Sequence, residues 1–394
     1  MDVSTLRINR NDVDKTTRED NVQVITDKVY ECLFENGKWI PYRARFDKEF
    51  PNRTDVAYHT WSLINNDVKS DYLSSLENAS AHSVKLSEED AGYFVMDATQ
   101  KRQRTIMNEV HMKMKLALYL VAKHYVYRTD PKRKQVFLYE TACGKFGDLH
   151  NWNRAGVTDV FVSDIDYTSL REGRRRLDDS GYRIVLRGYA TVDLTKPIDN
   201  VNAIVSKNVP MVEQDKMRQS LKTYFIDEEP QFDISSCQFA LHYFCKDKET
   251  FLQYIYNATL KLKTGGVFIA TIMDGKRVFD TMKGKQSING YMKSSDGENV
   301  AVWNIEKVSR QEGDWIKLKD FGQEINVTIN TIGKTHNEYL VNVDAIKQLL
   351  SLNKLQLIQQ IPFLSHTPKF YGSGYESLKQ FSDLHVMLVF KKLN

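Results

Sequence analysis

The chain has 394 residues, of which 41% are hydrophobic, so it is long enough for one large domain with a core and a smaller second unit. Its net charge of +4 is only a weak indication of a polyanionic partner, but three basic clusters, at 101–104, 131–134 and 171–176, together favour a substrate that carries phosphate. No run of about 18 apolar residues occurs, and the four cysteines show no CxxC pair or metal-ligand spacing with histidine, so we expect neither a membrane span nor a zinc site.

The N-terminal region is predicted to be rich in strand. Apolar residues alternate over 22–47, and Asn36-Gly37 has the composition of a tight turn, so a β-hairpin is expected there. A helix is expected near 56–68. Residues 65–92 are polar and mixed in composition, which is typical of a linker.

From residue 104 onward, helical and strand patterns alternate. A helix is predicted over 104–126 from its apolar spacing. The elements expected after it are strand–turn–helix units at 134–152 and 156–177, a strand at 232–244, a helix at 248–262, a turn at 263–266, a strand at 267–275, late strands around 305–330, a helix at 342–353 and a last strand at 385–392. This alternation predicts a mostly parallel, doubly wound α/β sheet of Rossmann-like type, which the late strands and the last strand would complete.

The turn after the first of these strands has the features of a cofactor site. The sequence "YETACGKFGDL" carries Ala142, Gly144 and Gly147 in the spacing of a dinucleotide fingerprint whose first glycine is replaced. Glu140 ends the strand and Asp148 opens the helix. Two carboxylates there would repel a pyrophosphate, so they favour a ligand with an ammonium or sulfonium group.

Two further carboxylates follow at the ends of the next strands. Asp164 lies 24 residues beyond Glu140, where a carboxylate can accept hydrogen bonds from both ribose hydroxyls. Asp193, in "TVDL", is placed to meet an adenine amino group. A cationic amino acid, a ribose and an adenine together describe S-adenosylmethionine. The alternative is a Rossmann-like sheet with ordinary loop carboxylates, and three acids at successive strand ends favour the cofactor.

The segment "FDISSCQFALHYF" raises a separate question. It has the composition of a buried strand, but Gln238, His242 and Tyr243 occupy positions where a core would need apolar side chains. These residues indicate a polar ligand at the end of the strand.

At these positions the sequence resembles the mRNA cap guanine-N7 methyltransferases. "SCQFALHYF" resembles their signature, and "CGKFGDLHNW" resembles their "CGKGGDLxKW", with Phe146 in place of a glycine. "SDIDYTSLREGRRR" resembles the ribose-binding segment, "NEYLVN" (337–342) resembles a guanine-binding segment, and "VHMKMK" (110–115) resembles an N-terminal helix motif. The resemblance covers about residues 104–394 and implies the methyltransferase version of the doubly wound fold.

The resemblance also implies an activity and a set of roles. The expected reaction is methyl transfer from S-adenosylmethionine to N7 of the cap guanine of GpppN-RNA, with S-adenosylhomocysteine as the product. The implied cofactor-binding residues are Lys115, Glu140, Ala142, Gly144, Asp148, Asp164, Ile165, Asp193, Gln238 and Phe239. The implied cap-binding residues are Arg176, His242, Tyr243, Glu338 and His385.

The chemistry of guanine agrees with these roles. Its N1–H and N2–H₂ groups are donors that a carboxylate such as Glu338 can accept, and O6 can accept from His242. Tyr243 offers an aromatic face or a hydroxyl. N7 has a free lone pair, so we expect no general base, no catalytic residue beyond those that position the reactants, and no metal.

Some positions depart from the family pattern. Met112 occupies a position where members usually carry asparagine, Ala142 replaces a glycine, and His385 occupies a position where a tyrosine is expected. These departures affect the expected contacts and leave the expected reaction unchanged.

The N-terminal hairpin has its own resemblance. In "GKWIPYRARFDKEFPN", Arg43, Arg45, Asp47 and Lys48 match the last motif of the OB-fold domain of mRNA guanylyltransferases. No Lys-x-Asp-Gly motif accompanies it at the right spacing, so no covalent guanylate intermediate is expected.

This second resemblance implies a domain plan and a setting. The plan is a guanylyltransferase OB-fold remnant over 1–65, a linker over 66–98 and the methyltransferase domain over 99–394. The expected partners are capped mRNA and the rest of a multifunctional capping enzyme with triphosphatase and guanylyltransferase parts, and the sequence leaves open whether a second subunit stimulates the activity. Few cysteines and no signal peptide suggest a reducing compartment. The fusion is typical of large DNA viruses, so the expected location is the host cytoplasm or the virion.

Three alternatives stay open. A methyltransferase for tRNA, a small molecule or a protein would share Glu140 and Asp164 but would not need "CQFxxHY" together with a distal "NEYLV". A non-catalytic RNA-binding or regulatory subunit of a capping complex could keep the fold without the activity. A NAD-dependent oxidoreductase is disfavoured by the acidic turn.

Overall fold

The computed structural model divides the chain into two units, Met1–Ala81 and His82–Asn394, which are described separately. The described residues are 30–35, 38–44, 98–130, 132–199, 204, 209–227, 229, 232–293, 297–309, 315–329 and 335–394, with the backbone alone for 30–35, 38–44 and 98–105.

In the first unit, the predicted hairpin is confirmed. Strands β1 (Tyr30–Glu35) and β2 (Lys38–Ala44) pair antiparallel, with Glu35 opposite Lys38. Arg43 lies in β2. The predicted helix over 56–68, most of the linker, and Arg45, Asp47 and Lys48 lie outside the described residues.

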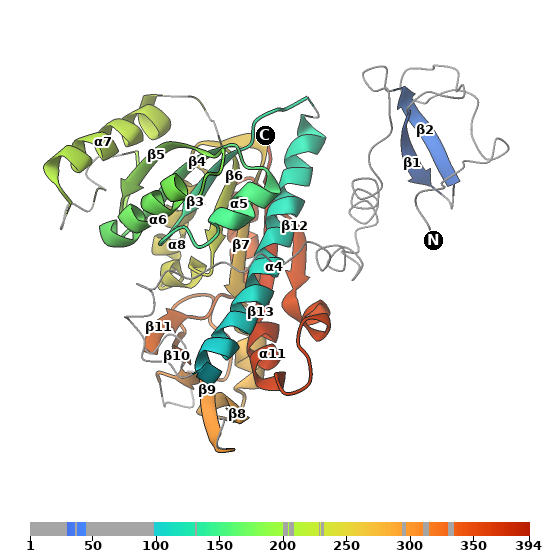
Figure 1. The fold of residues 1–394 in the computed structure, drawn as a ribbon, viewed down its shortest axis with the longest axis vertical. Helices are drawn as coiled ribbons and strands as arrows, with labels where there is room; N and C mark the ends of the chain where they lie inside the picture. The colour runs from blue at the N-terminus through green and yellow to red at the C-terminus, as the bar shows by residue number, and fades with distance from the viewer. Residues whose placement is uncertain are drawn as a thin grey trace. The chain divides into compact units, whose positions relative to one another are not determined.

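The second unit is built on a seven-stranded sheet in the order β12-β13-β7-β6-β3-β4-β5 (Figure 1). Strands β7, β6, β3, β4 and β5 are parallel, whereas β13 and β12 are antiparallel additions at one edge. The bounds of these strands are β3 (Phe137–Thr141), β4 (Asp159–Asp164), β5 (Val185–Thr191), β6 (Phe232–Gln238), β7 (Leu262–Met273), β12 (Leu355–Pro362) and β13 (His385–Lys392). The predicted α/β fold with a mostly parallel sheet is therefore confirmed.

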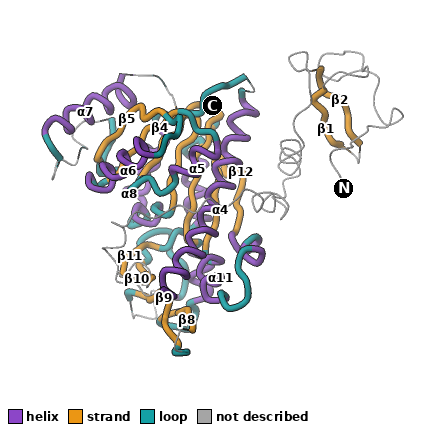
Figure 2. Tube along the Cα trace, in the orientation of Figure 1, coloured by secondary structure: helices purple, strands orange, loops and turns teal. Residues whose placement is uncertain are grey.

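Helices flank both faces of this sheet (Figure 2). The long helix α4 packs against α5 and against β6 and β7, α7 packs on β5, and α10 packs on β12. Because right-handed crossovers run from β3 to β4 to β5 in one direction and from β6 to β7 in the other, α5 and α6 cover one face and α8 covers the opposite face. The helix bounds are α4 (Ala98–Thr129), α5 (Leu149–Ala155), α6 (Tyr167–Asp179), α7 (Met211–Leu221), α8 (Lys248–Thr259), α9 (Gly275–Thr281), α10 (Val343–Leu352) and α11 (Glu376–Asp383).

The order of the strands fixes where a ligand can bind. The chain leaves β3 towards β4 on one side and reaches β6 on the other, so the topological switch point lies between β3 and β6. In open α/β sheets, ligands bind outside the carboxyl ends of the strands at such a point. None of the described helices is long and apolar enough to cross a membrane.

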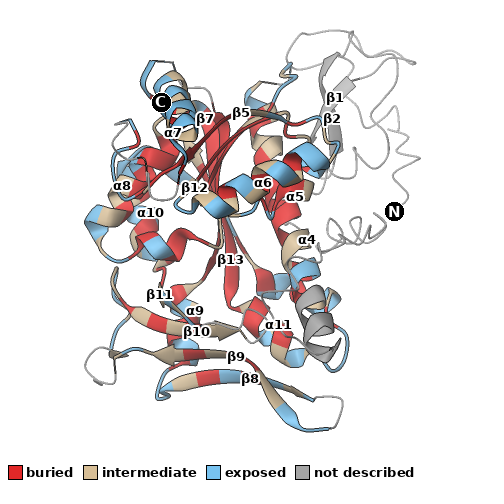
Figure 3. Cartoon of the chain, turned by 60° about the vertical axis from the view of Figure 1, so that its left-hand side comes forward, coloured by how far each residue is buried: buried red, intermediate tan, exposed pale blue. Residues whose placement is uncertain are grey.

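Burial explains why the central strands form where they do. Residues of β3, β4, β6 and β7 are almost all buried because helices cover both faces (Figure 3), so apolar residues predominate in β7 after Gly266 while the polar residues of β6 are buried as well. The helix predicted over 248–262 ends at Thr259, and β7 already begins at Leu262, so the predicted turn at 263–266 belongs to the strand. Gly265 adopts a φ of 79° there.

The prediction that the strands around 305–330 complete the main sheet is wrong. Those residues belong to a separate antiparallel sheet in the order β11-β10-β9-β8, which lies beside the carboxyl edge of the main sheet (Figure 3). Its strands are β8 (Ser287–Lys293), β9 (Asn299–Lys307), β10 (Glu324–Ile329) and β11 (Thr335–Tyr339). Only about a quarter of their residues are buried, which fits a sheet with at most one covered face, and alternation in sequence does not specify which sheet a strand joins.

The two sheets are joined by a close backbone contact. Gly275, which begins α9 directly after β7, donates its backbone N–H to the Val341 carbonyl at 2.9 Å. The preceding Asp274 forms a parallel bridge with Val341, just after β11. A Cβ on Gly275 would lie 2.6 Å from the Val341 oxygen, so only glycine allows this approach.

We predict that Gly275→Ala moves β11 away from the main sheet. The new methyl group would meet backbone rather than a flexible side chain, so the protein should lose about 1–3 kcal/mol of stability. Thermal unfolding measures this loss. The matched control is Gly372→Ala, because none of the described atoms apart from those of its chain neighbours lies within 4 Å of the added Cβ there, and it should unfold like the wild type. Equal unfolding temperatures for both variants would contradict the prediction.

Candidate functional site

The predicted acidic residues meet at the carboxyl edge of the main sheet. Glu140 lies in β3, Asp164 ends β4, Asp193 follows β5 by two residues, and Gln238 ends β6. Because β6, β3, β4 and β5 are consecutive neighbours in the sheet, the four residues line one continuous edge across the switch point.

The loop between β3 and α5 has an unusual backbone. Ala142, Gly144 and Phe146 all have positive φ, at 49°, 50° and 56°. The Gly144 N–H donates to Asp164 Oδ2 at 2.7 Å, and the Asp166 N–H donates to Asp164 Oδ1 at 2.9 Å. Burial raises the pKa of Asp164, and these two donors oppose that shift. The Asp164 carboxylate is thus oriented by the loop before any ligand arrives.

Phe146, which departs from the family pattern, fits because of a glycine on the next helix. Its ring is buried and lies 5.5 Å from the ring of Trp152. A Cβ on Gly173 of α6 would lie 2.3 Å from the Phe146 ring. The absence of a side chain at Gly173 therefore makes room for the larger residue in the loop.

Glu140 lies beneath the loop, with 2% of its surface exposed. The Tyr119 hydroxyl donates to its Oε2 at 2.7 Å, and the Ser236 hydroxyl donates to its Oε1 at 3.0 Å. Burial, followed by the nearby negative charge of Asp148, raises the pKa of Glu140 above its usual range. Both oxygens are occupied by protein donors, so Glu140 offers charge and support to the site and no free hydrogen-bonding edge.

Lys115 brings the helix α4 into the site. Its Nζ lies 2.7 Å from Asp148 Oδ1, and Asn151 Nδ2 donates to the same carboxyl oxygen at 3.0 Å. The Lys115 Nζ also lies 5.5 Å from the centre of the Phe239 ring. Met112, another departure from the family pattern, accepts a hydrogen bond from Asn151 through its backbone carbonyl.

Gln238 is held in one orientation. Its Nε2 donates to Ser236 Oγ at 2.9 Å, and its Oε1 accepts from Thr271 Oγ1 at 2.6 Å. The next residue, Phe239, has a φ of 55°, so the chain turns sharply where β6 ends. This turn carries the chain into the 3₁₀ helix Leu241–Phe244.

His242 and Glu338 meet across the two sheets. His242 Nδ1 lies 3.8 Å from Glu338 Oε2. Burial lowers the pKa of His242 to about 3 and raises that of Glu338 to about 7, so the contact is not an ion pair near neutral pH. Among the described residues, none provides a hydrogen-bond partner for the buried His242 Nε2. An unpaired polar atom at a sheet edge points to a ligand that pairs with it.

Tyr243 and Ile165 are the exposed residues of the site. Tyr243 is 50% exposed, and its ring lies 4.1 Å from that of His242. Ile165, directly after Asp164, is 62% exposed. Large apolar side chains exposed beside buried carboxylates are suited to contact a flat ligand.

Three predicted residues are engaged elsewhere. His385 is 4% exposed, its Nδ1 lies 3.0 Å from the Phe381 carbonyl, and its ring lies 5.4 Å from that of Phe239, so it supports Phe239 from behind. Arg176 pairs with Glu172 one turn away on α6. Asp193 accepts from the hydroxyl of Thr195 at 2.6 Å.

Four residues that hold this edge together are not predicted from the sequence. These are Tyr119, Ser236 and Thr271, which bond to predicted residues, and His111, whose ring stacks on Phe239. The available signal was Tyr119, because it lies one helical turn after Lys115 and carries a hydroxyl within an apolar stripe.

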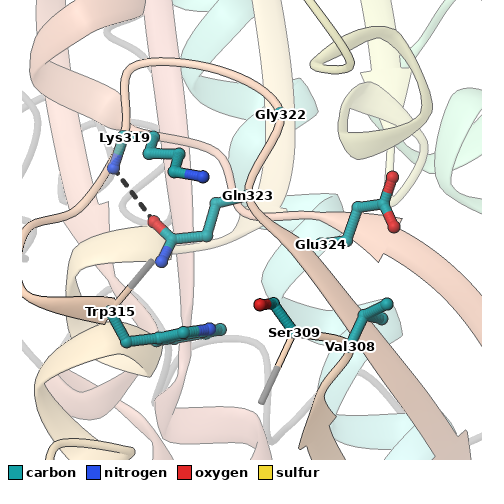
Figure 4. Close-up of a pocket in the computed structure, with 7 residues that line it drawn as sticks. All are labelled: Val308, Ser309, Trp315, Lys319, Gly322, Gln323 and Glu324. Carbon is teal, nitrogen blue, oxygen red and sulfur yellow. Dashed lines mark hydrogen bonds between the residues drawn. The ribbon is translucent and has the colours of Figure 1, made fainter. Parts of the chain in front are cut away.

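The described part of the chain also contains a separate cavity of about 150 Å³ beside β10. Trp315 forms one wall, and Lys319, Gln323 and Glu324 lie around it (Figure 4). None of the predicted site residues lines this cavity. The described residues contain no cluster of histidine, cysteine, aspartate or glutamate that could hold a metal ion.

Residues 92–380 match the mRNA (guanine-N(7))-methyltransferase domain. The chain belongs to the mRNA cap guanine-N7 methyltransferase family. Residues 1–74 match the C-terminal domain of mRNA capping enzymes. Both resemblances in the sequence are therefore confirmed, and with them the methyltransferase version of the fold.

Individual relatives are distant and longer. The chain is 23% identical over 361 residues to a probable mRNA-capping enzyme of Acanthamoeba polyphaga mimivirus. The matched region is 86% of this chain and 30% of that protein. The chain is 28% identical over 246 residues to the mRNA cap guanine-N(7) methyltransferase of Caenorhabditis elegans, covering 62% and 57%. A solved S-adenosylmethionine-dependent methyltransferase of Clostridium acetobutylicum is 13% identical, with a TM-score of 0.41, over 69% of this chain and 91% of that one. The matched regions span 30% and 57% of the length of these two curated relatives.

The raised pKa of Glu338 gives a prediction about stability. A carboxyl whose pKa is higher in the folded state favours folding while it is protonated, and this contribution is lost as the pH rises from about 4.5 through about 7. Glu338→Gln should therefore be more stable than the wild type at pH 8, by about 3 kcal/mol at most, since one pKa unit corresponds to about 1.4 kcal/mol. The difference should shrink towards zero near pH 5. Thermal unfolding across this range measures it, and the exposed Asp178→Asn is the control. A difference that does not change with pH would refute the prediction.

Proposed function

We propose that this chain transfers the methyl group of S-adenosylmethionine to N7 of the 5′ guanine of GpppN-capped RNA. The observation that carries the proposal is the His242–Glu338 pair, because His242 lies four residues beyond Gln238, which ends β6 at the acidic strand edge. A site for a polar, planar base would then lie beside one suited to a cationic, ribose-containing cofactor. Membership of the cap methyltransferase family supports the same conclusion.

The residues at the strand edge fit S-adenosylmethionine. Asp164 would accept hydrogen bonds from the ribose hydroxyls, and Ile165 and Asp193 would flank the adenine. Lys115 has three donor protons, so it can bond Asp148 and still meet the methionyl carboxylate. The backbone of Ala142 and Gly144, with Gln238 and Phe239, would enclose the remainder.

The guanine would bind between the two sheets. Ionised Glu338 accepts from N1–H and N2–H₂, and neutral His242 donates from its unpaired Nε2 to O6. The His242 ring must be neutral there. A neutral ring offers one donor to O6 and leaves the negative charge of the Glu338 carboxylate in place. Tyr243 would cover one face of the base.

The protein supplies position rather than proton transfer. The cofactor provides a methyl group already activated by its sulfonium. N7 carries a free lone pair, so no described residue needs to remove a proton. Holding the two reactants in line can lower a barrier by roughly 7–11 kcal/mol in favourable cases, and this is the contribution we assign to the site.

The wider setting is part of the proposal. Arg176 would reach the cap phosphates after exchanging its contact with Glu172. The N-terminal unit, with Arg43, would belong to a capping enzyme that also carries triphosphatase and guanylyltransferase parts, acting in the host cytoplasm or virion of a large DNA virus. The match of residues 1–74 and the mimivirus relative support this setting.

The proposal is tested by incubating the protein with labelled S-adenosylmethionine and GpppG-capped RNA, followed by nuclease digestion and identification of the labelled nucleoside. We predict label at N7 of the cap guanine. Glu338→Gln should lose roughly 100-fold or more of kcat/KM for capped RNA, because its amide offers a donor where the guanine needs a second acceptor. Label on a 2′-hydroxyl, on an internal base, or nowhere would overturn the proposal.

A second prediction concerns the cofactor alone. Asp164→Asn should bind S-adenosylhomocysteine about tenfold more weakly, since one charged acceptor for the ribose is lost. Isothermal titration calorimetry measures the affinity, and Asp178→Asn on α6 is the control. Unchanged affinity in Asp164→Asn would remove Asp164 from the cofactor site.

A further inference from the structure

Tyr119 is a buried residue whose hydroxyl connects α4 to the strand edge. It is 0% exposed and so cannot touch a ligand. Its hydroxyl donates to Glu140 Oε2 at 2.7 Å, accepts from Trp152 Nε1 at 3.2 Å, and lies 3.2 Å from Ser236 Oγ. Side chains from β3, α5 and β6 therefore meet at one phenolic oxygen of α4.

The bonds continue from Ser236 to the end of β6. Ser236 donates to Glu140 Oε1 and accepts from Gln238 Nε2 at 2.9 Å, and Thr271 of β7 donates to Gln238 Oε1. When Glu140 is ionised, the hydroxyl protons of Tyr119 and Ser236 both point at its carboxylate, so the 3.2 Å contact between the two hydroxyl oxygens carries no proton. A chain of hydrogen bonds thus runs from α4, through β3 and β6, to β7.

This arrangement suits an ionised Glu140. Each carboxylate oxygen accepts one hydroxyl, whereas a protonated carboxyl would need one of these hydroxyls to turn away. Burial and the charge of Asp148 act in the opposite direction and raise the pKa of Glu140. The two hydroxyls oppose neutralisation of this carboxylate, and the nearby ammonium of Lys115 acts in the same direction.

We propose that the Tyr119 hydroxyl is a positioning group for the cofactor: it orients the carboxyl of Glu140, favours its ionised form and, through Ser236, fixes the amide of Gln238. The inference rests on the proposed function, because it concerns the same cofactor site. The negative charge of Glu140 lies beneath the loop of Ala142 and Gly144, where it attracts the ammonium of the methionyl group without contacting it.

Loss of the Tyr119 hydroxyl would change how the affinity for the cofactor depends on pH. Without the Tyr119 hydroxyl, the pKa of Glu140 rises further, so a larger fraction of Glu140 is neutral near pH 7.5 and the cofactor binds more weakly. Raising the pH ionises Glu140 again and restores the affinity. A tyrosine that only filled space would give a loss that does not depend on pH.

The experiment measures S-adenosylhomocysteine affinity by calorimetry from about pH 6.5 to about pH 9 for wild type and Tyr119→Phe. We expect about tenfold weaker binding by Tyr119→Phe at pH 7.5 and recovery towards wild type at the upper end, a shift of about one pH unit in the profile. The matched control is Tyr139→Phe. Tyr139 is equally buried, lies next to Glu140 on the opposite face of β3, and bonds only Ser163 among the described residues, so its profile should match wild type.

Two further variants keep the test decisive. Ser236→Ala removes the other donor to Glu140 and should shift the profile in the same direction if Tyr119→Phe does not fold. Glu140→Gln should lose the pH-dependent step, and adding Tyr119→Phe to it should not restore one.

The outcomes separate the inference from the proposed function. If the wild type binds no S-adenosylhomocysteine, the proposed function fails. If the wild type binds but Tyr119→Phe matches it at every pH, or is weaker by the same factor throughout, the positioning role is wrong.

Discussion

A buried negative charge at the carboxyl edge of the central sheet is the constraint on which this protein depends. Glu140 and Asp148 lie close enough to raise the pKa of Glu140, and almost no water reaches either of them. The surrounding structure offsets this cost with hydroxyls from Tyr119 and Ser236 and with the ammonium of Lys115. A cation placed in the loop would relieve the same repulsion, which is the physical basis for the proposed cationic cofactor.

The second part of the site, His242 and Glu338, lacks such compensating groups among the described residues. His242 is buried and Glu338 is partly buried, and burial shifts the pKa of each towards its neutral form. The acidic strand edge would hold the cofactor, and the His242–Glu338 pair would discriminate the base. The half-exposed Tyr243 marks the boundary with solvent.

The geometry between the halves depends on backbone contacts rather than on side chains. Glu338 lies on the small sheet, and His242 follows a strand of the large one. The approach of Gly275 to Val341 sets their separation, and the sharp turn at Phe239 directs His242 towards β11. The aromatic cluster of His111, Phe239, Phe363 and His385 fills the space behind this turn, which explains how a histidine is accommodated at 385 without facing the ligand.

The sequence by itself determined the local chemistry: the alternating strands and helices, the acids at successive strand ends, and the polar residues Gln238 and His242 after a buried strand. These follow from periodicity and from residue type, which are properties of neighbouring positions. Tertiary structure alone decided that residues 299–329 leave the main sheet, that Tyr119 reaches Glu140 across 21 positions, that Glu338 meets His242, and that His385 lies behind Phe239. Strand partners and buried hydrogen bonds depend on which distant surfaces pack together, and no short window of sequence carries that information.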